Sequence, residues 1–226
     1  MKRLELKQIK KTFQSGEVEE EVLKGINLSL KEGEWTALTG ASGSGKSTLL
    51  TIAAGLQPAT AGEVLFDGKV LDSNNKKAMR QARAEAFGFI FQSSHLVPFL
   101  TVEEQLAMML DVSGWTAYKR EKKQRIREAL DKVAMTHRTN AYPSSLSGGE
   151  KQRVAVARAI IHDPKVLFAD EPTASLDSKR SIEIMELIQD VTQSSRTTTL
   201  MVTHEEELLS YVDRTVKMSD GRITTS

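Results

Sequence analysis

The sequence predicts an α/β fold built around a parallel sheet. Short runs of apolar and β-branched residues recur along the chain, as in strands buried on both faces, and helical patterns separate the later runs. The early runs, within residues 1–30, are hairpin-like and predict a small antiparallel layer at the N-terminus. From Ser93 to Arg158 the strand pattern stops and charged helical patterns replace it, which predicts an all-helical insertion.

The expected strands are the apolar or β-branched runs in chain order. They are Leu4–Ile9, Leu23–Leu30, Trp35–Thr39, Val64–Phe66, Phe87–Gln92, Val166–Ala169, Thr198–Val202 and Thr215–Met218. Helices are expected at Ser47–Gly55 and at Val154–Ile161, and helical spacing of Ile182, Met185 and Ile188 indicates another.

Within the insertion, Ile126, Leu130 and Val133 recur at helical spacing and predict one buried helix face. The length of 226 residues suits a single domain with a core that needs no disulfides. We therefore expect a core of residues 1–92 and 159–226 and a helical subdomain of residues 93–158.

The composition excludes several classes of function. Cysteine is absent, which excludes disulfides, thiolate metal sites and cysteine nucleophiles. The net charge of +1 gives no basic excess of the kind that nucleic-acid-binding domains show, so no nucleic-acid partner is expected. The N-terminal segment has no signal-peptide pattern, and no apolar run is long enough to span a bilayer. A soluble, intracellular protein is expected.

A glycine-rich loop follows the strand expected at Trp35–Thr39 and precedes a helix. It fits the pattern GxxxxGK[ST] and consists of Gly40, Ala41, Ser42, Gly43, Ser44, Gly45, Lys46, Ser47 and Thr48. Glycines allow successive backbone N–H groups to surround a phosphate at a helix N-terminus. Lys46 supplies a positive charge for the β- and γ-phosphates, and the Ser47 hydroxyl is an oxygen ligand for Mg²⁺. The loop therefore predicts a nucleotide site for ATP and Mg²⁺.

Two carboxylates follow the strand expected at Val166–Ala169. Asp170 and Glu171 would lie at the carboxyl edge of the sheet, where ligands of α/β folds bind. Side chains alternate along a strand, so the two acids have different roles. We assign Asp170 to the metal and Glu171 to the base that polarises the attacking water. Without the phosphate loop, solvated acids would be the simpler interpretation.

His204 follows the strand expected at Thr198–Val202. It is well placed to hydrogen-bond a γ-phosphate, although a structural histidine would have the same pattern. The spacing of the four histidines does not match a zinc site.

Residues 146–153 read LSGGEKQR and continue as VAVARA. This stretch strongly resembles the signature motif of ATP-binding cassette (ABC) ATPases, and the resemblance covers essentially the whole chain. It implies a P-loop NTPase core of the RecA type, with an antiparallel β layer and an inserted helical subdomain that carries the signature.

The resemblance also implies further site residues. Phe13 resembles the aromatic residue that stacks on adenine, and Gln92 resembles the Q-loop glutamine, which serves the metal and catalysis. Ser175, Leu176 and Asp177 resemble the D-loop, and His204 resembles the switch histidine. The resemblance also implies that the signature residues Ser147, Gly148 and Gly149 contact nucleotide. Phe13 replaces a commoner tyrosine and Glu150 a frequent glutamine; neither change removes a predicted phosphate contact.

The family resemblance further implies a head-to-tail homodimer that sandwiches two ATP molecules, each completed by Ser147 and Gly149 of the second copy. It implies an integral-membrane permease as partner, and hence a peripheral location on the cytoplasmic face of the cell membrane. The segments VLKGINLSL, GFIFQSSHLVP and ADEPTASLDS resemble the lipoprotein-release, macrolide-export and cell-division branch of the family. Within that branch, FIFQSSHLVPFLTVEEQL and ADEPTASLD resemble the ATPases of haem-efflux transporters.

This similarity predicts an ATPase subunit that energises export of haem or another hydrophobic compound. The alternative is a mechanotransmission or regulatory ATPase that moves no cargo across the membrane. A soluble cassette of DNA repair or translation is not expected, because the chain has one phosphate loop and no long insertion.

The sequence leaves the roles of four segments open. Ser93–Thr101 would contact the permease or pack internally, and Met108-Met109 fits the core better than a contact surface. The acidic run Glu17–Glu21 predicts a solvated loop. The basic run Lys119–Arg127 fits a solvated helix face better than a lipid contact.

Overall fold

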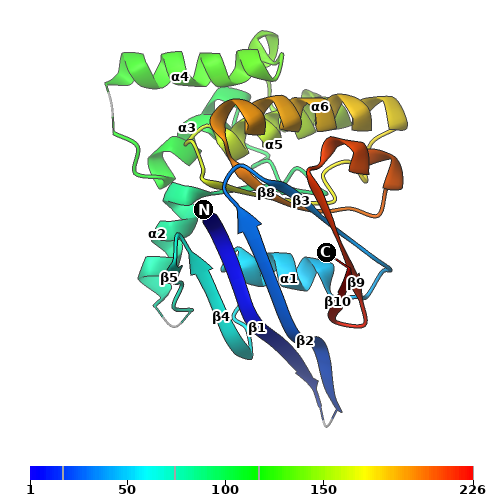
Figure 1. The fold of residues 1–226 in the computed structure, drawn as a ribbon. Coiled ribbons are helices and arrows are strands. Elements are labelled where there is room, and N and C mark those ends of the chain that lie inside the picture. The colour runs from blue at the N-terminus through cyan, green and yellow to red at the C-terminus, as the bar shows by residue number, and fades with distance from the viewer. Residues whose placement is uncertain (17, 74, 117, 226) are drawn as a thin grey trace. The chain divides into compact units, whose positions relative to one another are not determined.

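The computed structural model describes residues 1–16, 18–73, 75–116 and 118–225 (Figure 1). The chain forms two compact units, one of residues 1–83 with 198–226 and one of residues 84–197. The expected helical subdomain of residues 93–158 lies within the second unit, but its limits do not coincide with the boundaries of that unit. The limits of the subdomain therefore stay a prediction.

A four-stranded antiparallel sheet in the order β2-β1-β4-β5 belongs to the first unit (Figure 1). Its strands are β1 (Lys2–Ser15), β2 (Val18–Lys31), β4 (Ala61–Phe66) and β5 (Lys69–Val70). β1 and β2 form a long hairpin in which Leu4 pairs with Leu30 and Leu6 with Leu28, all four buried. The expected antiparallel layer is confirmed.

The first unit also contains strands in the order β10-β9-β3-β8. They are β3 (Trp35–Thr39), β8 (Thr198–Val202), β9 (Arg214–Ser219) and β10 (Arg222–Thr225). β3 pairs in parallel with both β8 and β9, and its apolar residues are buried, as the sequence predicts. Helix α1 (Lys46–Ala53) contacts β8. The short helix η3 (Glu206–Tyr211) connects β8 to β9 along the chain.

The second unit contains the parallel strands β6 (Phe87–Phe91) and β7 (Val166–Asp170). Its helices are α3 (Val102–Val112), α4 (Lys119–Lys132), α5 (Gly148–Ile160) and α6 (Ser178–Ser195), with short helices η1 (Thr136–Arg138) and η2 (Pro143–Ser145). α5, which begins with the signature residues, contacts β6, α3, α4 and α6 and is therefore central to the packing of this unit. Phe87 and Phe168 meet edge to face on the paired strands.

Helix α2 (Lys76–Ala86) contains the boundary between the units. The sequence did not predict it, nor the short strands β5 and β10. The buried side of α2 is formed by Met79 and small alanines such as Ala86, so its hydrophobic stripe is weaker than the stripes on which the helix predictions depend.

Burial confirms one predicted helix face and corrects two other expectations. Ile126, Leu130 and Val133 are at most 3% exposed, as expected. The helix indicated by Ile182, Met185 and Ile188 is confirmed as α6, although Ile182 itself is 43% exposed. Met108 is 38% exposed rather than in the core. Glu19–Glu21 lie on β2 rather than in a loop, exposed along the distal part of the hairpin, and Glu17 lies outside the described residues.

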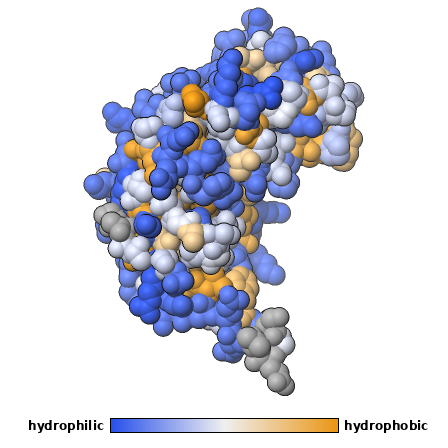
Figure 2. All heavy atoms as spheres, turned by 90° about the vertical axis from the view of Figure 1, so that its right-hand side faces the viewer, coloured by the Kyte–Doolittle hydropathy of each residue, from blue (hydrophilic) through white to orange (hydrophobic). Residues whose placement is uncertain are grey.

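Hydrophilic side chains cover most of the face shown in Figure 2, with smaller hydrophobic patches between them. In the parts of the chain that the structure describes, no helix combines the length and apolar character needed to cross a bilayer.

Candidate functional site

The predicted phosphate loop connects β3 to α1 in the first unit. Gly43 and Gly45 have φ angles of 79° and 96°, in the left-handed region that glycine adopts without strain. Gly45 is the N-cap residue of α1, and no side chain caps this helix. The N–H groups of the first turn of α1 are therefore suited to an anion.

The start of this loop is packed tightly against the C-terminal strands of the same unit. Gly40 has a φ of 138°, and a Cβ atom there would lie 2.1 Å from the carbonyl oxygen of Met218 on β9. The Gly221 N–H group, in the turn between β9 and β10, donates a hydrogen bond of 3.3 Å to the Ser44 carbonyl. These two contacts hold the phosphate loop against β9 and against the turn between β9 and β10.

Two polar side chains of the loop are buried. Lys46 is 7% exposed, and its Nζ donates to the carbonyl oxygens of Gly40 and Ala41 over 2.9 Å each. The Ser44 hydroxyl is also buried, and it has no hydrogen-bond partner within the described structure. A buried hydroxyl without a partner is costly, so a ligand with oxygen atoms would satisfy it.

Phe13 and His204 belong to the same unit as the phosphate loop. Phe13, on β1, is 39% exposed, and the Lys11 ammonium lies 5.0 Å from the centroid of its ring. The Thr203 N–H group donates to the Leu38 carbonyl over 3.2 Å. The end of β8, and His204 after it, therefore lie beside the end of β3, from which the loop emerges.

The predicted acids lie in the second unit. Asp170 is the last residue of β7 and pairs in register with Phe91, the last residue of β6. Gln92 follows Phe91 directly, so Gln92 and the two acids share one edge of the paired strands. Glu171 has a φ of 47°, which is uncommon for a residue other than glycine and is found at functional sites where the surrounding structure holds it.

Gln152, on α5, connects these two strand ends. Its side chain is 2% exposed, and its amide group donates to the Phe91 carbonyl over 3.1 Å and to the Pro172 carbonyl over 2.7 Å. One side chain therefore holds the residue before Gln92 and the residue after Glu171. Gln152 is not among the site residues predicted from the sequence, although a polar residue in helical register with the buried Val156 and Ala159 could have indicated it.

The predicted D-loop lies beside the same edge. The Ser175 hydroxyl donates to the Gln92 carbonyl over 3.3 Å. Asp177 is the N-cap residue of α6, and its carboxylate accepts a hydrogen bond of 3.0 Å from the Arg180 N–H group. One oxygen of the Asp177 carboxylate therefore caps the N-terminus of α6.

The signature residues form the beginning of α5. Ser147 is the N-cap residue, and its hydroxyl accepts from the Glu150 N–H group over 3.3 Å, while the Glu150 carboxylate accepts from the Ser147 N–H group over 2.8 Å. The hydroxyl accepts in this capping bond, and its proton can donate either to the Glu150 carboxylate or to a phosphate. Gly149 faces the Arg180 side chain, whose Cδ would lie 3.2 Å from an added Cβ.

Glu150 has a structural role of its own. Arg138 donates from Nε to its carboxylate over 2.9 Å. The Ser147 N–H group, followed by Arg138 and the Ser147 hydroxyl, lowers the pKa of Glu150 to about 2. The acid that replaces the frequent glutamine is therefore ionised and stabilises the helix N-terminus with its charge.

The predicted site residues thus fall into two sets. The first unit holds Phe13, the phosphate loop of residues 40–48 and His204, and the second holds Gln92, Ser147, Gly148, Gly149, Asp170, Glu171 and Asp177. In the first unit, the paired ends of β3 and β8 bring the phosphate loop and His204 together. In the second unit, the paired ends of β6 and β7 bring Gln92, Asp170 and Glu171 together. Their roles stay predictions.

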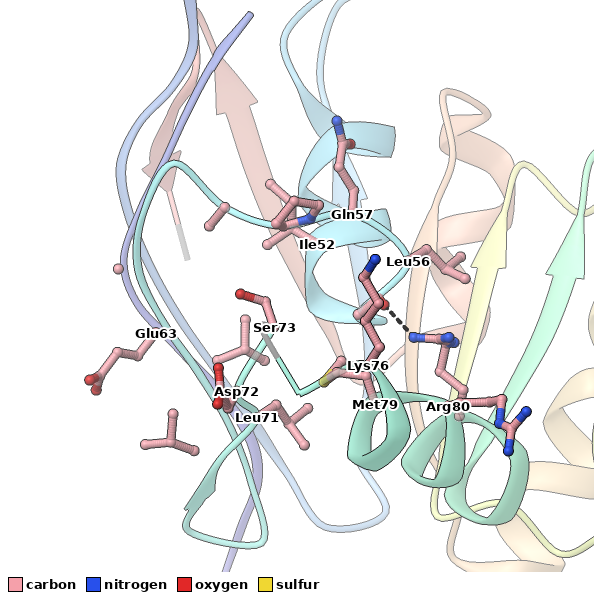
Figure 3. A pocket seen from close by; sticks show the side chains of 17 residues that line it. Ile52, Leu56, Gln57, Glu63, Leu71, Asp72, Ser73, Lys76, Met79 and Arg80 are labelled. Carbon is pink, nitrogen blue, oxygen red and sulfur yellow. Dashed lines mark hydrogen bonds between the residues drawn. The ribbon is translucent and has the colours of Figure 1, made fainter. Parts of the chain in front are cut away.

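A cavity of about 550 Å³ in the first unit is separate from these residues (Figure 3). Ile52 and Leu56 line it from the α1 side, and Met79 and Arg80 line it from α2. Arg83 donates to the Gly55 carbonyl over 2.7 Å at its edge. None of the predicted site residues lines this cavity, so it is not the site formed by the phosphate loop.

A family model described as ABC transporter matches residues 23–174. Curated proteins named "Putative hemin import ATP-binding protein HrtA" are similar over nearly their whole length. The protein from Staphylococcus saprophyticus is 45% identical over 223 residues, which is 99% of this chain and 99% of that protein. The protein from Staphylococcus haemolyticus is 46% identical over 220 residues, which is 97% of this chain and 98% of that protein.

Solved structures show the same fold. A dimeric structure of the ATP-binding cassette MJ0796 in a post-hydrolysis state, bound to ADP and Pi, has a TM-score of 0.90 at 35% identity, covering 98% of this chain and 96% of that chain. CbiO1 from Clostridium perfringens, described as part of the ABC transporter complex cbiONQ, has a TM-score of 0.86 at 30% identity, with 98% and 86% covered. The expected P-loop core with an antiparallel layer and a helical insertion is confirmed.

Proposed function

The chain belongs to the ABC transporter family as one of its ATP-hydrolysing cassettes, and on that premise we propose that it energises export of haem or another hydrophobic compound through a separate membrane permease. The observation that carries the nucleotide part of this proposal is the phosphate loop. There the uncapped helix N-terminus, the buried Lys46 and the unpartnered Ser44 hydroxyl lie on one short segment.

The residues of the loop fit ATP with Mg²⁺. The Ser44 hydroxyl is a buried polar group that a phosphate oxygen would satisfy, and Lys46 would exchange its two carbonyl partners for phosphate oxygens. Ser47, Gln92 and Asp170 offer a hydroxyl, an amide and a carboxylate, which are the oxygen donors that Mg²⁺ prefers. No group of three or more acidic or histidine side chains that could hold a metal ion occurs among the described residues. ATP phosphates and water are proposed to complete the shell. Bound Mg²⁺ would neutralise phosphate charge.

Glu171 is proposed as the base that polarises the attacking water, and His204 as a hydrogen-bond donor to the γ-phosphate. Gln92 is proposed to act together with Glu171 and His204, beside Mg²⁺. Gln152 supports this assignment, because it holds the carbonyls next to both Gln92 and Glu171.

A second copy of the chain is proposed to complete each site in a head-to-tail dimer. The cassette MJ0796 is dimeric in the solved structures. In this chain, Ser147 at the N-terminus of α5 offers a hydroxyl proton and helix amides, which form a second anion site that the chain's own phosphate loop does not need. Asp177 of the D-loop would lie at the same interface.

Haem is proposed as cargo because the staphylococcal relatives carry hemin in their names. The names of those relatives describe import, whereas the branch that the sequence resembles is one of export. The direction of haem transport is therefore a separate measurement. A cassette that controls a membrane partner without moving cargo is the alternative. In either case, binding to the permease would hold the chain at the cytoplasmic face of the membrane.

Glu171→Gln tests the hydrolytic assignment. This variant should bind ATP and form dimers that gel filtration detects, while its hydrolysis rate falls to near background. Glu186→Gln makes the same chemical change at an exposed position of α6 and should leave hydrolysis unchanged. Turnover close to the wild-type rate in Glu171→Gln would show that another group acts as the base.

Purification of the chain with the membrane protein encoded beside it tests the cargo. ATP hydrolysis by the complex should rise with haem and not with lipoprotein or antimicrobial peptide. The complex in vesicles with the cassette outside should then move haem inward when ATP is added, which corresponds to export. Stimulation by peptide or lipoprotein alone would support the regulatory alternative, and ATP-driven haem movement out of these vesicles would indicate import.

A further inference from the structure

α4 carries four cations on one side of the helix, which we call the basic face: Lys119, Arg120, Lys123 and Arg127. Together with Gln124 they line a single shallow hollow on the protein surface, so their side chains lie next to one another. Three of the four follow at intervals of four residues, which places them on one stripe of an α-helix. The opposite stripe is buried through Ile126, Ala129 and Leu130.

The other two cations of this run are neutralised by acids of neighbouring segments. Lys122 pairs with Asp111 of α3 over 2.5 Å, and Arg125 pairs with Asp163 over 2.5 Å and donates to the Ile161 carbonyl. These pairs attach α4 to the rest of the second unit. The structure therefore separates the six cations of the run into two that fix the helix and four that do not.

The basic face has no acid of its own among the residues that the structure describes: none of its four cations forms a salt bridge there. Glu103 lines a neighbouring hollow with Lys123 and Arg127 without pairing with either. Glu128 accepts a hydrogen bond from Gln124 over 2.8 Å. Four cations side by side repel one another, and an anionic surface would relieve that repulsion.

The segment before α4 exposes an aromatic and an apolar side chain of the kinds found at membrane interfaces. Tyr118, directly before Lys119, is 83% exposed, and Val112 at the end of α3 is 60% exposed. Tyrosine is enriched at the level of lipid headgroups, where its ring and hydroxyl meet different environments. The full chain has a net charge of only +1, so an anionic surface would attract this face rather than the whole molecule.

We propose that the basic face of α4 binds the anionic headgroups of a lipid bilayer. This rests on the proposed membrane location, but it assigns a contact that the cassette makes by itself, without permease or nucleotide. Basic residues near an anionic leaflet each raise the partition coefficient about fivefold at low salt. The contact would orient the second unit at the membrane.

Co-sedimentation of the full-length chain with lipid vesicles tests the proposal. We expect binding to vesicles of 70% phosphatidylcholine and 30% phosphatidylglycerol at low salt, at least about tenfold above binding to pure phosphatidylcholine vesicles. Raising the salt to about 0.5 M should abolish it. The variant with Lys119, Arg120, Lys123 and Arg127 all changed to Gln should bind the anionic vesicles at least about tenfold more weakly than the wild type.

The matched control changes four exposed lysines of the first unit, Lys7, Lys10, Lys69 and Lys77, to Gln. It has the same net charge as the test variant and should bind vesicles as the wild type does. Equal losses in both variants would overturn the proposal, because net charge would then explain binding. So would equal binding to neutral vesicles, or displacement by inorganic phosphate at matched ionic strength. ATP hydrolysis should persist in both variants, which separates this proposal from the proposed function.

Discussion

The side-chain amide of Gln152 donates a hydrogen bond of 2.7 Å to the carbonyl oxygen of Pro172 from a position that is 2% exposed to solvent. Its second donor hydrogen reaches the Phe91 carbonyl. The helix that begins with the signature residues is thereby joined to the segment after Glu171 and to the segment before Gln92. A displacement of α5 would therefore be transmitted to both predicted catalytic residues.

Gln152→Glu should lower ATP hydrolysis at least about tenfold while ATP affinity stays within about twofold. A carboxylate cannot donate to two carbonyl oxygens, and leaving buried groups unpaired costs about 1–3 kcal/mol. Hydrolysis kinetics and calorimetric titration with ATP measure the two effects separately. Gln193→Glu, an exposed change on α6, is the control. Equal losses of affinity and turnover would indicate general unfolding instead of mispositioning.

Lys46→Ala should weaken ATP binding about 10- to 100-fold, because a charged hydrogen-bond donor to phosphate is lost. Fluorescence titration with a nucleotide analogue measures the affinity. Lys77→Ala, an exposed lysine of α2, should bind as the wild type does. Unchanged affinity in Lys46→Ala would contradict the role assigned to the loop.

Glu150→Gln should reduce stability at neutral pH by about 0.5–1 kcal/mol, the range of a well-oriented exposed ion pair. The pKa of Glu150 is lowered from 4.5 to about 2 in the folded chain, so its charge stabilises the fold above about pH 4.5. This contribution is lost as the pH falls from about 4.5 towards 2. Urea unfolding of both proteins at pH 7 and at acid pH should show the difference shrinking. A constant difference would mean that the amide disturbs packing instead.

His162 should make the protein less stable as the pH falls below about 6.5. Burial lowers the pKa of His162 below 6.5, and its Nε2 lies 3.0 Å from the Phe87 carbonyl, to which the neutral ring donates. The unfolded chain therefore binds the proton more readily, with a limiting slope of about 1.4 kcal/mol per pH unit.

His162→Gln retains a donor for the Phe87 carbonyl and should show a smaller decline of unfolding free energy between pH 7.5 and 5.5 than the wild type. His95→Gln, at an exposed histidine, should leave the wild-type decline unchanged. Identical pH profiles for His162→Gln and the wild type would assign the decline to other groups.

The fold was predictable from sequence where burial imposes a strict pattern. The apolar runs of β3, β7 and β8 coincide with the observed strands to within one residue. Prediction failed where solvent surrounds an element. Glu19–Glu21 extend β2 because they pair with β1 on an exposed hairpin, where no hydrophobic alternation is needed. α2 was missed for the same reason.

Candidate site residues could be proposed from the sequence because phosphate chemistry demands particular side chains at fixed spacing, as in the loop of residues 40–48. The contacts that hold these residues in place could not be proposed in this way. Gln152 and Arg138 act through backbone carbonyls and a helix cap, and such partners come from segments distant in sequence. The separation of the basic run into paired and unpaired cations likewise depends on where Asp111 and Asp163 lie.

The contact between Gly221 and Ser44 makes the C-terminal hairpin a remote reporter of the phosphate loop. The amide hydrogen of Gly221 exchanges with solvent only when it leaves the Ser44 carbonyl, and that carbonyl belongs to the segment that would close around phosphate. Deuterium uptake at a turn far from the loop along the chain would therefore slow when nucleotide orders the loop. Deuterium uptake at Gly221 would therefore detect nucleotide bound at the phosphate loop without any label placed in the loop.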